Sequence, residues 1–213
     1  MDLATRILYE DNHLIIINKM AGEIVQGDKT GDKPLIDDVK SYLKTRYHKE
    51  GNVFCGLVHR IDRPVSGAVV FAKTSKALSR MTVKVKDRDF RKTYLALVKN
   101  EKQNKSYVVP EGTKEAKLAR LSYRVVGKSE TFYLLEVELF TGRHHQIRCQ
   151  LAHIGCPIRG DLKYGYPRSN PDASISLHAW RIAFEHPVLK TQIEIKAPLP
   201  EVAPWTAFQQ LSD

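Results

Sequence analysis

The stretch ARLSYRVVGKSETFYLLEVELF, residues 119–140, decides the fold class that we predict for this chain. It reads as two β-rich runs on either side of the turn residues GKSE, which is typical of an antiparallel hairpin. The stretch RILYEDNHLIIINK, residues 6–19, repeats this pattern around Asp11 and Asn12. Strands joined by short turns pair antiparallel, so the sequence favours a largely antiparallel sheet over a doubly wound one.

Outside these two stretches, short β-rich runs alternate with amphipathic segments. The further strands that we expect are residues 68–74, 91–100, 177–186 and 191–198. The helices that we expect are residues 34–47, 76–89 and 142–155, and a last one from Pro204. This mixture predicts an α+β fold with a central mixed, mainly antiparallel sheet and flanking helices.

Two of these helices carry start and stop signals. Ser75 and Thr141 stand where an N-cap would be, directly before the helices at 76–89 and 142–155. An apolar stripe at helical spacing marks the buried side of the second one, formed by Ile147, Leu151 and Ile154. Gly155 and Pro157 are expected to end it.

The length of 213 residues suits one domain over residues 1–213. Residues 99–112 are polar and read as a surface connection, too short to separate two domains. Neither G-x-G-x-x-G nor G-x-x-x-x-G-K-[ST] occurs, so the sequence excludes Rossmann and P-loop nucleotide binding.

The chain is strongly basic, with 34 Lys and Arg against 24 Asp and Glu and a net charge of +10. Such a balance attracts polyanions, of which nucleic acid is the commonest. A basic but merely solvated surface is the alternative, and charge alone does not decide between the two.

The three cysteines, Cys55, Cys149 and Cys156, show no C-x-x-C spacing, and no apolar run at the start resembles a secretory signal. No stretch reaches the roughly 20 apolar residues of a membrane-spanning helix. We therefore expect a reduced protein of the cytoplasm without a membrane segment.

The stretch HRIDRPVSG, residues 59–67, surrounds one carboxylate, Asp62, with His59, Arg60 and Arg63. A turn-rich loop entering a strand is a plausible position for a reactive carboxylate. A surface loop with ordinary ion pairs is the alternative.

The stretch TGRHHQIR, residues 141–148, gathers cationic side chains at an expected helix start, where anions bind well. They are Arg143, His144, His145 and Arg148. A solvated helix face is the alternative. Adjacent histidines on a helix point to different faces and no H-E-x-x-H occurs, so we expect no metal site.

Tyr94, in the strand KTYLALV, alternates with packing residues, and packing on a sheet face is its default interpretation. A phenol beside a basic segment is also suited to stack on a nucleic-acid base.

Taken in order, five stretches resemble the RluA-type family of pseudouridine synthases over nearly the whole chain. They are NKMAGEIV, GLVHRIDRPVSGAVVFAKT, RKTYLALV, FTGRHHQIRCQLAHIGCPIRGDLKYG and LHAWRIAFEHP. The H-R-[LI]-D-x-x-x-S-G pattern is highly specific for that family, and T-G-R-x-H-Q-I-R nearly so.

The resemblance implies that Asp62 is the catalytic aspartate, that Tyr94 contacts the target base, and that Arg148 pairs with Asp62. It also implies an active site in a cleft and conversion of uridine in ribosomal or transfer RNA to pseudouridine, without metal or organic cofactor. We expect a monomer whose further contacts to RNA come from His59, Arg60, Arg63, Arg143 and His145.

The chain departs from the family pattern at two positions. Val65 stands where many members have Thr, and Met20 where many have Pro. A hydroxyl contact at position 65 is therefore not expected. Because the first motif lies close to the start of the sequence, we do not expect the small N-terminal RNA-binding domain that many relatives carry.

Three questions stay open at this level. Asp62 either attacks C1′ as a nucleophile or removes the C2′ proton, and Tyr94 either stacks or also transfers the C5 proton. A protein that binds RNA without catalysis is one rival function. A hydrolase of the N-glycosidic bond is another, with Asp161 as its second acid.

Overall fold

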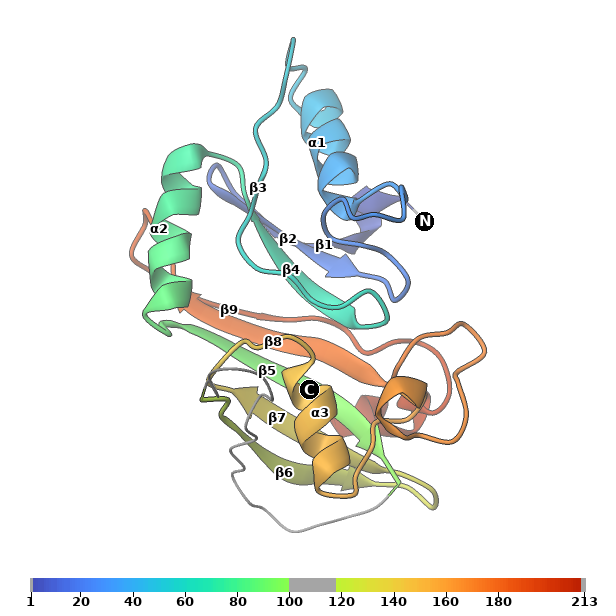
Figure 1. Ribbon diagram of the computed structural model, residues 1–213. Helices are drawn as coiled ribbons and strands as arrows, with labels where there is room; N and C mark the ends of the chain where they lie inside the picture. The colour runs from blue at the N-terminus through green and yellow to red at the C-terminus, as the bar shows by residue number, and fades with distance from the viewer. Residues whose placement is uncertain (1, 100–117, 212–213) are drawn as a thin grey trace. The chain divides into compact units, whose positions relative to one another are not determined.

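The computed structural model describes residues 2–99 and 118–211 (Figure 1). The chain divides into two compact units. Unit 1 comprises Met1–Phe90 and Arg181–Ala197, and unit 2 comprises Arg91–Trp180 and Pro198–Asp213. The single domain over residues 1–213 stays a prediction. The surface connection expected at residues 99–112 lies, apart from Lys99, outside the described residues.

Unit 1 is built on antiparallel strand pairs. Its strands are β1 (Ile7–Glu10), β2 (Leu14–Lys19), β3 (Gly56–Leu57), β4 (Ser66–Ala72), β9 (Gln192–Lys196) and the second half of β8 (Leu177–Glu185). β2 pairs with β1 and with β4, β3 also pairs with β4, and β9 pairs with β8. The hairpin expected at residues 6–19 is confirmed.

The turn of this hairpin is held by one aspartate. Asp11 Oδ1 accepts hydrogen bonds from the backbone N–H groups of His13 and Leu14, each at 2.7 Å. A short carboxylate that replaces backbone acceptors in this way is typical of Asx turns. The sequence Asp11-Asn12 therefore fixes where β1 ends and β2 begins.

Unit 1 has two helices and a short 3₁₀ helix, η1 (Leu3–Arg6). α1 (Leu35–Arg46) lies within the predicted helix over residues 34–47 and buries Leu35, Val39 and Leu43, which share one helix face. α2 (Ser75–Lys86) begins one residue earlier than predicted. Its N-cap is Thr74, whose hydroxyl accepts from Ala77 N at 3.1 Å, so the prediction of a Ser75 cap is wrong.

The core of unit 1 joins the sheet to α2. It contains Leu14, Ile16, Ala68, Val70, Ala77, Met81, Phe90, Ile182 and Phe184. β2 is buried on both faces, because Leu14 to Ile17 are all 0% exposed. A run of apolar residues without alternation is what such a doubly covered strand requires.

Unit 2 contains the stretch on which the fold prediction depends. β5 (Phe90–Val98) pairs with β7 (Tyr133–Leu139), which pairs with β6 (Leu121–Lys128), all antiparallel. The hairpin at residues 119–140 is thereby confirmed. Its turn closes with a hydrogen bond from Ser129 N to Phe132 O at 2.8 Å.

α3 (Gln146–His153), drawn in front of the strands of unit 2 in Figure 1, is shorter than expected. The prediction of a helix over residues 142–155 with a Thr141 cap is wrong at its start. His145, directly before α3, has φ 52°, which is left-handed and cannot belong to an α-helix. The expected end is confirmed, because Gly155 has φ 80° and follows the last turn.

The rest of unit 2 consists of 3₁₀ helices and a second core. η2 (Leu162–Tyr164) follows α3, and η3 (Trp205–Leu211) stands where the sequence predicts a last helix from Pro204. The core contains Leu95, Leu97, Leu134, Trp180, Leu199, Trp205 and Phe208. Leu95 and Leu97 alternate with Tyr94 and Ala96, so η3 packs on the face of β5 that Tyr94 does not occupy.

The α+β class and the mainly antiparallel sheet with helices that the sequence predicts are confirmed. Within the part of the chain that the structure describes, every helix is too short or too polar to cross a membrane.

Candidate active site

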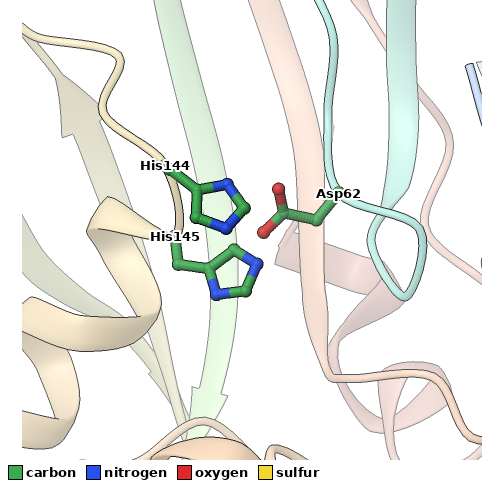
Figure 2. A group of neighbouring side chains, drawn as sticks. All are labelled: Asp62, His144 and His145. Carbon is green, nitrogen blue, oxygen red and sulfur yellow. The ribbon is translucent and has the colours of Figure 1, made fainter. Parts of the chain in front are cut away.

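Asp62 lies in the loop between β3 and β4 of unit 1, from which its side chain projects (Figure 2). The backbone N–H of Val65 donates to the carbonyl of Asp62 at 3.0 Å, which closes a turn over residues 62–65. Ile61 and Val65 on either side are buried, with 8% and 2% exposure. Two apolar anchors therefore hold a carboxylate that is itself partly exposed.

A buried lysine fastens this loop to β2. Lys19 is 0% exposed, and its ammonium donates to the carbonyls of Met20 at 2.8 Å, Arg63 at 3.1 Å and Val65 at 2.8 Å. The N–H of Gly22 also donates to the carbonyl of Arg63, at 2.8 Å. Burial lowers the pKa of Lys19 to about 7, while the nearby carboxylates of Glu23 and Asp62 raise it. The side chain of Lys19 thus holds the loop that carries Asp62 against β2.

The three cationic residues around Asp62 have different environments. Arg60 is exposed. Arg63 is about half exposed and pairs with Asp32 at 2.7 Å. His59 turns inward, where its Nε2 accepts from Val70 N at 3.2 Å and its ring lies 5.0 Å from that of Phe90. The His59 contacts favour a structural role for this residue.

In unit 2, the loop before α3 is held together by one amide side chain. Gln146 Oε1 accepts from the Thr141 hydroxyl at 2.8 Å and from Arg143 N at 3.1 Å. The Thr141 oxygen in turn accepts from Arg120 N at 2.7 Å. Thr141 and Gln146 are both buried, which protects these hydrogen bonds from water. In the stretch T-G-R-H-H-Q, Thr141 and Gln146 therefore hold a loop together, and Thr141 is not a helix cap.

The two adjacent histidines lie in that loop and not in the helix. Their rings stack at 3.8 Å between centroids with an interplanar angle of 26° (Figure 2). The expectation that they point to different helix faces is therefore wrong, because α3 begins only after His145. Neither unit by itself gathers three metal-ligating side chains among its described residues. The expected absence of a metal stays a prediction.

Arg148, on α3, forms a buried bidentate pair with Asp161. Arg148 Nε lies 2.7 Å from Asp161 Oδ2, and Arg148 Nη2 lies 2.8 Å from Asp161 Oδ1. The two side chains are 7% and 1% exposed. Planar two-point pairing of this kind orients a guanidinium strongly. A guanidinium has five N–H donors, so this pair does not exclude the expected contact of Arg148 with Asp62, which stays a prediction.

The Arg148 guanidinium also determines the tautomer of His145. Arg148 Nη1 lies 3.1 Å from His145 Nε2, and a guanidinium can only donate. His145 Nε2 is therefore the acceptor, and its proton is on Nδ1, which lies 3.1 Å from the hydroxyl of Tyr164. The Tyr164 ring lies 5.1 Å from the centre of the Arg148 guanidinium. The result is a network of four side chains with a neutral imidazole.

Tyr94 lies on β5 in unit 2 and is 7% exposed. It is in register with Val137 of β7, which is in register with Tyr123 of β6. The three side chains therefore form a row across one face of the sheet. This placement agrees with packing on a sheet face, and its role toward a base stays a prediction.

Sequence reasoning missed three features of this arrangement. Lys19 gave no signal because lysine is rarely buried in full. From the sequence, Asp161 is only the candidate second acid of a hydrolase, and Tyr164 has no assigned role. Apart from the hydrogen bond of Lys19 to the neighbouring Met20, their contacts join segments 13 or more residues apart, which local spacing does not encode.

Comparison with known proteins identifies a family. A family model described as RNA pseudouridylate synthase matches residues 13–153. The "Uncharacterized RNA pseudouridine synthase YlyB" of Bacillus subtilis (strain 168) is 32% identical over 92% of this chain and 69% of its own length. The "Ribosomal large subunit pseudouridine synthase D" of Nitrosomonas europaea is 33% identical over 92% of this chain and 62% of its own length. The chain thus spans about two thirds of these relatives.

Solved structures agree in fold. The structure titled "Human RNA Pseudouridylate Synthase Domain Containing 4" has a TM-score of 0.81 at 22% identity and covers 99% of this chain and 92% of its own. "Human RNA Pseudouridylate Synthase Domain Containing 1" has a TM-score of 0.72 at 21% identity, with 94% of this chain and 86% of its own covered. At these identities the similarity establishes the fold alone.

Proposed function

Because the chain belongs to the RNA pseudouridylate synthase family, we propose that it converts uridine in RNA to pseudouridine with Asp62 as the catalytic carboxylate. The observation that carries this proposal is the family match over residues 13–153, which includes Asp62, Tyr94 and Arg148. The anchoring of the Asp62 loop by Lys19 supports it, since a reacting group must be held in a defined position.

The reaction breaks the bond from C1′ to N1 of uridine, turns the uracil, and joins C1′ to C5. N1 gains a proton and C5 loses one, so no atom enters or leaves overall. Asp62 either attacks C1′ or removes the C2′ proton, and both routes need an ionised carboxylate at the sugar. A duplex hides these atoms, so the substrate is a loop nucleotide or one flipped out of its stack.

Two residues of unit 2 complete the proposed machinery. Tyr94 stacks on the uracil while it turns; a phenol with a pKa of about 10 is a weak base at neutral pH, which makes stacking its main role. Arg148 orients the carboxylate of Asp62. The bidentate pair with Asp161 supports this proposal, because it fixes the plane of the Arg148 guanidinium.

The RNA is bound through its phosphates by exposed cations on both units. Arg60 and Arg143 are exposed and suited to this, and we also assign Arg63 and His145 to RNA contact. His59 is assigned to holding the Asp62 loop in place, given its contacts to Val70 and Phe90.

We propose large-subunit ribosomal RNA as the first substrate to test, because several relatives carry that RNA in their names. Transfer RNA is the second. The enzyme is proposed to act in the cytoplasm, as a monomer, without metal or organic cofactor.

Hydrolysis of the N-glycosidic bond is the rival activity. It needs a second carboxylic acid, and Asp161 was the candidate in the sequence. Asp161 is 1% exposed and both of its carboxylate oxygens accept hydrogen bonds from Arg148, which leaves it poorly placed to act on a substrate.

The test is a product analysis. Unmodified transcripts of large-subunit ribosomal RNA and transfer RNA are incubated with the protein, digested to nucleosides and separated by chromatography. We expect pseudouridine and no free uracil from at least one of the two. Free uracil with an abasic strand would favour the hydrolase, and unchanged uridine in both would contradict the proposal for these substrates.

A further inference from the structure

Lys92 is an unusual lysine on β5 of unit 2. It precedes Tyr94 by two residues, so the alternation of the strand places both on the same face. Its ammonium lies against the loop before α3, because a Cβ added to Gly142 would stand 3.4 Å from Lys92 Nζ. Burial lowers the pKa of Lys92 below its usual value, and no carboxylate raises it again.

Other buried or partly buried lysines of the chain have clear partners. Lys73 pairs with Glu10 at 2.7 Å, Lys84 pairs with Asp89 at 2.8 Å, and Lys19 donates to three carbonyls. Among residues 2–99 and 118–211, we find no hydrogen bond or ion pair to the Lys92 ammonium. Lys92 is partly exposed, and an ammonium that burial partly removes from water gains from an anionic partner. We expect a lysine of this kind where a bound ligand supplies the anionic partner that the protein lacks.

The surroundings in unit 2 indicate which anion this is. Arg143 follows Gly142 directly in this loop, and Arg120, which precedes β6, borders the loop through the hydrogen bond from its backbone N–H to Thr141. The permanent anions of an RNA substrate are its phosphates, whereas a uracil base is neutral before reaction. A lysine ammonium acts as a compact charge that suits phosphate oxygens.

We propose that Lys92 binds a backbone phosphate of the substrate RNA beside the nucleotide whose base stacks on Tyr94. Residues i and i+2 of a strand are about 7 Å apart, so the phosphate and the base are held by neighbouring positions of one rigid element. The inference rests on the proposed function and assigns Lys92 to substrate positioning, with no proton transfer.

The test combines stability with the salt dependence of RNA binding. The variants are Lys92→Met and Lys92→Arg, with Lys44→Met as the control, because Lys44 is exposed on α1 of unit 1. The probe is an unmodified transcript of large-subunit ribosomal RNA. Thermal unfolding, the Kd for the transcript over a range of salt concentrations, and the KM and kcat for pseudouridine formation are measured.

We expect Lys92→Met to unfold at the same or a higher temperature than the wild type, because the desolvated charge is removed. Its affinity for the transcript falls about tenfold at low salt, as for one charge-assisted hydrogen bond. The slope of log K against log salt becomes shallower by about 0.7 to 0.9. KM rises more than kcat falls, Lys92→Arg restores the slope, and Lys44→Met matches the wild type.

Two results would overturn the assignment. A lower unfolding temperature with an unchanged salt slope means that Lys92 has only a structural role. A lower kcat with unchanged affinity and slope means that it acts on the base rather than on a phosphate. The proposed function itself is tested with the wild type alone. Pseudouridine formation by the wild type does not depend on the results for the Lys92 variants.

Discussion

Lys19 is the residue that fixes the loop carrying Asp62. Its ammonium is fully buried, and two of its three acceptors, the carbonyls of Arg63 and Val65, belong to the turn that begins with Asp62. Polar groups buried in this way are costly to leave without partners. The position of the loop that carries Asp62 therefore depends on these hydrogen bonds from Lys19.

The lowered pKa of Lys19 makes its contribution to stability depend on pH. Its pKa is about 7 in the folded protein against an ordinary value of 10.5, so the unfolded chain binds more protons between these values. This term therefore makes the free energy of unfolding rise with pH, by about 2 kcal/mol from pH 7 to pH 9.

Denaturant unfolding of the wild type and Lys19→Met at pH 7, 8 and 9 measures this effect. The wild type should gain stability relative to the variant as the pH rises, and Lys44→Met should follow the wild type. A difference that stays constant or shrinks would show that Lys19 does not titrate in this range.

Asp62 is the residue whose loss should separate binding from chemistry. Asp62→Asn keeps the size of the side chain and removes the negative charge, so turnover should be lost while affinity for RNA stays within a few-fold of the wild type. Single-turnover assays and equilibrium binding measure the two quantities. A variant that keeps substantial turnover would contradict the role of Asp62.

At the scale of single residues, the family motifs predict roles for Asp62, Tyr94 and Arg148, and these roles stay predictions. The sequence could not identify Asp161 as the partner of Arg148, because the pair joins α3 to the segment before η2. Motif spacing describes local structure, whereas this ion pair depends on how the chain folds back.

Among the elements, the start of α3 differs most from the prediction, because the segment between Thr141 and α3 is not helical. Residues 142–145, which the sequence predicts as the start of a helix, instead form a loop. Hydrogen bonds of Thr141 and Gln146 hold this loop. The left-handed conformation of His145 excludes it from the helix, and side-chain hydrogen bonds compete with helix formation. Propensity and periodicity do not predict such a competition.

Thr141→Val tests the importance of this loop. The change keeps the shape and removes the hydroxyl, leaving Arg120 N and Gln146 Oε1 each with one partner fewer. We expect the free energy of unfolding to fall by about 1 to 2 kcal/mol, measured by denaturant titration. Thr131→Val, at an exposed position, is the control and should have little effect. Equal stability of Thr141→Val and the wild type would show that the hydrogen bonds add nothing.

Elements with a strong pattern were predicted well. The hairpins at β1–β2 and β6–β7 and the buried faces of α1 and α3 agree with the sequence. Helix starts were less predictable. Thr74 rather than Ser75 caps α2, because both hydroxyl residues are able to cap a helix and the backbone geometry decides which of them does.

For the whole molecule, the net charge of +10 predicts a binding behaviour. RNA affinity should fall linearly on a plot of log K against log salt, because phosphate contacts release counterions. Replacing Arg60 and Arg143 together by Gln should make the slope shallower by about 1.5, for two phosphate contacts. Filter binding at several salt concentrations measures this. An unchanged slope would mean that these two arginines do not contact phosphates.

The central claim is that the protein isomerises uridine through Asp62, and release of the C5 hydrogen tests it most directly. Large-subunit ribosomal RNA and transfer RNA transcripts, tritiated at C5 of uridine, are incubated with the wild type and with Asp62→Asn side by side. The account predicts tritium in the water for the wild type and none for Asp62→Asn. Equal release by both proteins, or none by the wild type with either RNA although it binds them tightly, would contradict it.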